Sequence, residues 1–152
     1  PVGNVAPEVM RLLAATEESL HVAISHARDG EMLGTLCASV EDHVVQYGYT
    51  VVREFVGHGV GRKLHEEPQV PNYGTKGARP RLKAGMALAI EPMVNLGTAK
   101  MRVLSDNWTA VTQDRKASAH YEHVVLITNG EPEVLTWRER MFPGGVEGLV
   151  AK

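Results

Sequence analysis

The sequence contains one cysteine, Cys37, and therefore cannot form a disulfide bond within the chain. Such low cysteine usage is typical of proteins in a reducing compartment, so we expect a cytoplasmic protein. No apolar run approaches the roughly 18 residues that a membrane-spanning helix needs, and the first residues show no signal-peptide pattern. The sequence therefore predicts a soluble protein without a membrane partner.

The chain also lacks a large excess of positive or negative charge. The formal net charge is −2, and acidic and basic residues are mixed along the chain. Nucleic-acid-binding domains usually carry a clustered basic surface, so the sequence predicts no nucleic-acid partner. We find no internal repeat, low-complexity tract or linker. A chain of 152 residues with 43% hydrophobic content fits one domain, 1–152.

Hydrophobic periodicity predicts two helices followed by strands. Apolar residues recur at helical spacing over 7–30 and again over 35–47, with Thr35 as the candidate N-cap and Gly48 as the stop. Strand composition then appears in segments 51–55, 86–93, 107–112, 120–128 and 134–136. This order predicts an α+β fold in which two helices pack on one face of an antiparallel sheet.

Three residues are candidates for metal binding. His58 lies between glycines, which allow a ligand to approach the imidazole closely. Glu91 follows one apolar run and Glu122 precedes another, and a carboxylate on a buried strand costs several kcal/mol unless it is paired, protonated or metal-bound. Together they would form a nitrogen and oxygen site suited to Mn, Fe, Co or Zn. Spacing alone leaves ordinary structural roles equally open.

Several motifs together resemble the type I methionine aminopeptidases. They are GHGVGR at 57–62, HEEPQVPNY at 65–73, KAGM at 83–86, IEPMVN at 90–95, DNWT at 106–109, TQDR at 112–115 and SAHYEH at 118–123. The motifs occur in the order and at the intervals of that family, and the similarity extends over roughly residues 2–136. Prolidase and aminopeptidase P share a looser His and Glu pattern, and the run at 65–70 favours the methionine enzyme.

The resemblance implies a pita-bread fold, in which two related α+β halves enclose a two-metal site. It also implies removal of the initiator methionine from nascent polypeptides. By position, His58, Glu91 and Glu122 would be metal ligands, with Glu122 bridging the two ions. Glu91 would in addition be the general base of the reaction.

The same resemblance implies contacts with the substrate. His65 matches a catalytic histidine that contacts the scissile amide and stabilises its transition state. Trp108 and Leu64 fall where the family lines the methionine pocket. Many relatives carry phenylalanine where this chain has Leu64, so the resemblance does not fix the shape of the pocket at that position.

The family also uses two aspartate ligands that precede the region matched here. We therefore expect the chain to be the C-terminal portion of the catalytic domain, binding at most one ion and showing little activity alone. Uncovered apolar surface would favour association with a complementary N-terminal fragment or with a second copy. Two alternatives remain: a non-catalytic half-domain that binds a peptide or partner, and a prolidase-like aminopeptidase.

Overall fold

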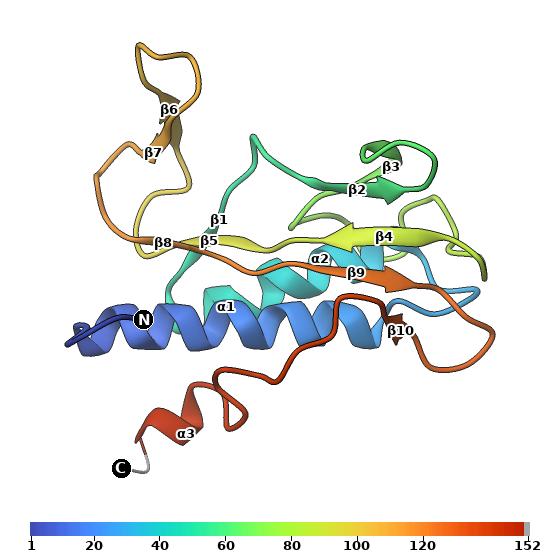
Figure 1. Ribbon diagram of the computed structural model, residues 1–152, viewed down its shortest axis with the longest axis horizontal. Helices are drawn as coiled ribbons and strands as arrows, with labels where there is room; N and C mark the ends of the chain where they lie inside the picture. Colours follow the sequence, from blue (N-terminus) through green and yellow to red (C-terminus); the bar gives the residue numbers. More distant parts are fainter. Residues whose placement is uncertain (151–152) are drawn as a thin grey trace.

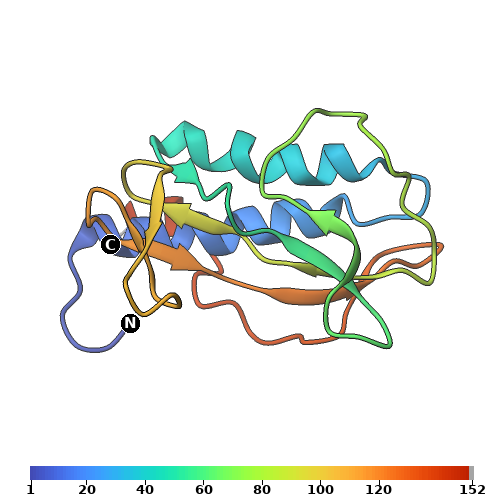
Figure 2. The same cartoon turned by 90° about the horizontal axis from the view of Figure 1, so that it is seen from above.

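Two antiparallel helices lie side by side against the sheets in the computed structural model, which describes residues 1–150 (Figures 1 and 2). Helix α1 spans Pro7–Ser25 and helix α2 spans Leu33–Val44. A 3-10 turn, η1 (Val45–Tyr47), continues α2 as far as Gly48, whose φ of 78° ends it. Gly48 therefore stops the second helix, as predicted, because glycine adopts the left-handed conformation without strain.

Helix α1 begins at Pro7, as predicted, whereas two other predicted helix ends differ from the structure. Helix α1 stops at Ser25, and the Asp29 carboxylate instead accepts a hydrogen bond from the backbone N–H of Ala84 at 2.8 Å. The prediction of Thr35 as the N-cap of the second helix is wrong, because Met32 holds that position without a side-chain cap. The Thr35 hydroxyl accepts a hydrogen bond from the Gly77 N–H at 3.2 Å. Both polar side chains therefore anchor the long loop that follows the third strand.

Ten strands form three antiparallel sheets within residues 1–150. They are β1 (Thr50–Val51), β2 (Gly57–Val60), β3 (Glu66–Val70), β4 (Ala87–Ile90), β5 (Met93–Asn95), β6 (Met101–Val103), β7 (Ala110–Thr112), β8 (Ser118–His120), β9 (His123–Leu126) and β10 (Glu133–Val134). The five-stranded sheet has the order β10-β9-β4-β2-β3 and the three-stranded sheet the order β1-β5-β8. Strands β6 and β7 form a hairpin that projects away from the helices (Figure 1). The α+β prediction is confirmed.

Two segments that the sequence predicts as continuous strands are each broken. Segment 86–93 becomes β4 and β5, which are separated by Glu91 and Pro92. Segment 120–128 is likewise broken at Tyr121 and Glu122, between β8 and β9. Proline has no N–H to donate to a strand ladder, so Pro92 accounts for the first break. Each broken strand thus leaves one sheet and enters the other.

The hydrophobic core fills the space between the helices and the sheets. Helix α1 packs against α2, β8, β5 and β4. Leu12 and Leu36 from the helices and Leu88 and Val94 from the strands are all fully buried. Burying one such side chain contributes about 1.5–3 kcal/mol, so this layer holds β4 and β5 in place on the helices.

After β10 the chain returns along the outer side of α1 to a short helix, α3 (Glu147–Val150) (Figure 1). The buried carboxylate of Glu17 accepts hydrogen bonds from the backbone N–H groups of Met141 and Phe142, both at 2.7 Å. These two bonds tie the C-terminal segment to α1. None of the described helices has the length and apolar composition that crossing a membrane requires.

Candidate metal centre

The two strand breaks lie level with each other. Strands β4 and β9 pair up to Ile90 opposite His123, and β5 and β8 resume at Met93 opposite His120. Between them, the Tyr121 N–H donates a hydrogen bond to the Pro92 carbonyl oxygen at 3.2 Å. The residues at the breaks, Glu91 and Glu122, are therefore close together. Neither belongs to a strand, so neither side chain follows the alternation of a regular sheet.

His58 approaches Glu91 from the neighbouring strand. It is paired with Ala89 across β2 and β4, and its Nε2 lies 3.6 Å from Glu91 Oε1. The His58 Nδ1 lies 2.9 Å from the Gly59 carbonyl oxygen, which can only accept, so Nδ1 carries the proton. In the neutral ring, the lone pair of Nε2 therefore faces a carboxylate oxygen. A second proton or a metal ion between these two atoms would remove the repulsion.

A second imidazole lies on the other side of the same carboxylate. His120 Nε2, at the end of β8, is 3.5 Å from Glu91 Oε2. Glu91, His120 and Glu122 each place one donor atom within 4.8 Å of the others. His120 is not among the residues predicted from the sequence. Its position two residues before Glu122 is only a weak signal, because the strand is interrupted between them.

The separations between the two imidazoles and Glu91 are compatible with those of ligand atoms around an ion. Hydrogen bonds join heavy atoms at about 2.7–3.2 Å, and the gaps of 3.5 and 3.6 Å are longer. Donors bound at about 2.0–2.2 Å to a tetrahedral ion lie roughly 3.4 Å from each other. The side chains of His58 and Glu91 are only 14% and 15% exposed. Imidazole and carboxylate donors of this kind fit Zn, Mn, Co or Fe(II).

His65 lies beside this cluster. Its ring centroid is 4.2 Å from that of His58, with 54° between the ring planes, and its side chain is exposed on the turn between β2 and β3. A cavity of about 370 Å³ is bordered by both histidines and by Gln69. His65 is thus placed where a bound molecule can reach it, and its catalytic role stays a prediction.

The two residues predicted to line the methionine pocket are both exposed. Leu64 is 71% exposed on the turn before β3, and Trp108 is 89% exposed on the turn between β6 and β7. Neither side chain is enclosed by the described residues. Their roles in substrate binding therefore stay predictions, and a pocket around them needs atoms from outside this range.

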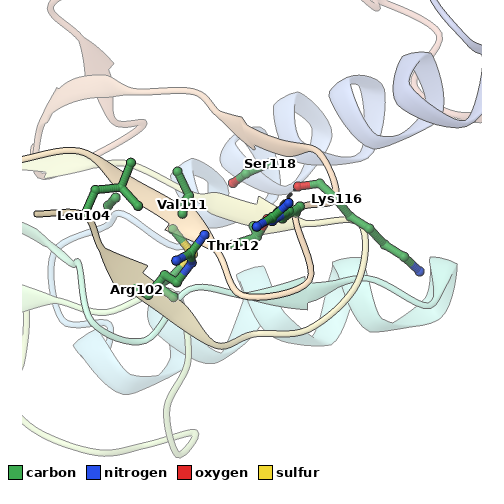
Figure 3. Close-up of a pocket in the computed structure, with 9 residues that line it drawn as sticks. Arg102, Leu104, Val111, Thr112, Lys116 and Ser118 are labelled. Atoms are coloured by element: carbon green, nitrogen blue, oxygen red, sulfur yellow. Dashed lines mark hydrogen bonds between the residues drawn. The ribbon is translucent and has the colours of Figure 1, made fainter.

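A separate cavity of about 430 Å³ lies between the β6–β7 hairpin and β8 (Figure 3). Its lining includes Arg102, Leu104, Val111 and Thr112, and none of the candidate metal ligands borders it. The thiol of Cys37 is buried, and burial raises its pKa to about 12, unlike the exposed, low-pKa thiol of a nucleophilic cysteine. The carboxylate and imidazole cluster is therefore the best-supported candidate site among the described residues.

A model of metallopeptidase family M24 matches residues 1–129, and the chain belongs to this family. Methionine aminopeptidase 1 of Bacillus subtilis is 48% identical over 136 residues, which are 90% of this chain and 55% of that protein. The methionine aminopeptidase of Escherichia coli is 43% identical over 135 residues, 88% of this chain and 51% of that protein. The chain thus spans about half the length of the curated relatives that it matches.

Solved structures of methionine aminopeptidases are also similar to this chain. The methionine aminopeptidase of Thermotoga maritima superposes with a TM-score of 0.88 at 45% identity, covering 90% of this chain and 55% of that one. A prolidase of Pyrococcus furiosus superposes with a TM-score of 0.68 at 24% identity, covering 91% of this chain and 35% of the prolidase. At this identity the similarity supports the fold alone. The predicted pita-bread fold is confirmed. Membership of a metallopeptidase family also implies that a divalent metal is used.

Proposed function

We propose that these residues form the C-terminal portion of a methionyl aminopeptidase, which removes the N-terminal methionine from nascent proteins. The cluster at the strand breaks, where Glu91 is flanked by imidazoles and lies near Glu122, is the observation that carries the proposal. Relatives that are 40–49% identical and named methionine aminopeptidase support it. The substrate would be a peptide or nascent chain with an N-terminal methionine, which fits a cytoplasmic location.

His58, Glu91 and Glu122 would hold the metal in this proposal. When bound, the metal supplies Lewis acidity, which lowers the pKa of water and polarises the scissile carbonyl group. Glu91 is suited to accept the proton of the attacking water, because its carboxylate oxygens face the centre of the cluster. His65 would donate a hydrogen bond to the oxyanion or to the leaving nitrogen from the exposed side.

We place the two aspartate ligands of the family outside these 152 residues. The chain by itself would then bind at most one Co, Mn, Fe or Zn ion, and its turnover would be low. Helices cover one face of the sheets, and no helix among residues 1–150 covers the other (Figure 1). We propose that a complementary N-terminal segment, or a second copy of the chain, covers that face. Sedimentation analysis of the chain alone, and mixed with such a segment, tests this association.

The function is tested by complementation with the N-terminal half of the Bacillus subtilis relative. The mixture is loaded with Mn or Co and assayed on the peptide Met-Ala-Ser and on a dipeptide with proline after the scissile bond. We expect cleavage of the methionine peptide only, and none with Glu91→Ala. The two halves of the Bacillus subtilis enzyme, split at the same position, are the positive control.

Three results would redirect the proposal. If the mixture cleaves neither peptide while the control is active, a non-catalytic half-domain that binds a peptide or partner is favoured. Cleavage of the proline dipeptide would favour a prolidase-like enzyme. Turnover by the chain alone that disappears with Glu91→Ala would show that its own residues, or a homo-oligomer, complete the site.

A further inference from the structure

His120 is not among the ligands that the family resemblance assigns, yet it is placed like one of them. Its Nε2 lies 3.5 Å from Glu91 Oε2, on the opposite oxygen from the one that His58 approaches. A direct hydrogen bond would be shorter, at about 2.7–3.2 Å. The gap matches instead the spacing of two donor atoms that share an ion.

The backbone fixes this position. His120 is the last residue of β8 and is paired with Met93 of β5, directly before the strand break that carries Glu122. Its side chain is 48% exposed, so the described core does not require an imidazole there. The donor atoms of His120, Glu91 and Glu122 nevertheless lie within 4.8 Å of one another.

We infer that His120 is a further metal ligand of this centre, binding through Nε2 together with Glu91 and Glu122. The inference rests on the proposed metal-dependent function and deepens it. With two of the family's ligands placed outside these residues, the His120 imidazole would supply a second nitrogen donor beside that of His58. It would also select for borderline ions such as Zn or Co over Mg, because imidazole suits those metals.

The test follows the histidine rings of the 152-residue chain by nitrogen-15 NMR, without and with zinc. Assignment uses His120→Gln and His58→Gln, and circular dichroism checks that each variant is folded. We expect the Nε2 resonance of His120 to move on zinc addition to the position of a metal-bound nitrogen and to stop titrating with pH. This readout reports ligation directly and does not depend on activity.

Zinc affinity, measured by competition with a chelating dye, gives the second readout. We expect His120→Gln to weaken binding by about 10–100-fold or more, since even outer-sphere partners of metal sites have effects of that size. His26→Gln is the matched control, because His26 caps the far end of α1 and does not belong to the cluster. It should bind zinc like the wild type.

Two results would overturn the inference, and they differ in what else they affect. If His120 keeps a free, titrating imidazole while His58 binds zinc, His120 is not a ligand, but the metal centre and the proposed function stand. If no histidine of the folded chain binds zinc, the metal centre of this chain fails together with the role of His120.

Discussion

The backbone N–H of Tyr121 donates a hydrogen bond to the carbonyl oxygen of Pro92 at 3.2 Å. This bond joins the two strands where both are interrupted, so that Glu91 and Glu122 leave their strands at the same level. An interruption of this kind removes two carboxylates from the regular side-chain alternation of a sheet. It thereby brings Glu122 near Glu91 and His120, while His58 of β2 approaches Glu91 from the neighbouring strand.

Glu91 is the residue on which the centre depends most directly, because both imidazoles face its carboxylate. We predict that Glu91→Gln weakens cobalt or manganese binding more than about 100-fold, beyond the usual effect of outer-sphere partners. Isothermal titration calorimetry on the metal-free chain measures this. Glu133→Gln, on exposed β10, is the control and should bind normally. Equal affinities of the Glu91→Gln variant and the wild type would remove Glu91 from the site.

The glycine after His58 is required by close backbone packing. A Cβ atom at Gly59 would lie well under 3.0 Å from the Glu67 carbonyl oxygen across β2 and β3. We predict that Gly59→Ala lowers the free energy of unfolding by about 1–3 kcal/mol, the usual cost of overpacking. Thermal unfolding measures this, with Gly130→Ala as control, since a Cβ there meets only the Thr128 hydroxyl at 4.0 Å. A Gly59→Ala variant as stable as the control would contradict the close approach of β3 to β2.

Glu17 anchors the C-terminal segment through two charge-assisted hydrogen bonds to Met141 and Phe142. We predict that Glu17→Gln lowers the free energy of unfolding by about 1–3 kcal/mol, because one buried N–H loses its acceptor. Amide hydrogen exchange at Met141 and Phe142 should accelerate at the same time. Glu8→Gln, which removes an exposed carboxylate from the first turn of α1, should leave the exchange unchanged and lower the free energy of unfolding by less than about 1 kcal/mol, the size of its interaction with the helix dipole. Unchanged exchange in the Glu17→Gln variant would show that the segment is held by other contacts.

Stability should depend on pH through His21. Burial, followed by the charge of Arg140, lowers the pKa of His21 below its ordinary value of 6.5. The unfolded chain therefore binds more protons, and the free energy of unfolding falls as the pH drops below about 6.5. Urea unfolding of the metal-free chain at several pH values should show a smaller slope in this range for His21→Gln. The same slope in both proteins would mean that His21 titrates alike in the folded and unfolded states.

Local sequence is sufficient to predict the helices, the α+β class and the stop at Gly48, because these follow from periodicity and backbone preference. It does not predict the strand breaks, since 86–93 and 120–128 each have the composition of a single strand. The change of sheet at Pro92 depends on pairing with a strand about thirty residues away, which no local pattern records.

In the candidate site, too, some residues can be predicted from local sequence and others cannot. His58, Glu91 and Glu122 stand out in the sequence because glycines and apolar strands make a histidine and two carboxylates unusual there. His120 does not stand out, because only the pairing of distant strands brings its Nε2 to 3.5 Å from Glu91 Oε2. Leu64 and Trp108 are suggested by resemblance alone, and their exposure shows that contacts within residues 1–150 do not define a pocket around them.

The metal centre is tested most directly by the metal stoichiometry of the folded 152-residue chain, measured by equilibrium dialysis against cobalt or manganese. We expect at most one ion per chain, weakly held and lost in the Glu91→Gln variant. Two tightly bound ions per chain, or one that is retained without the Glu91 carboxylate, would contradict this expectation.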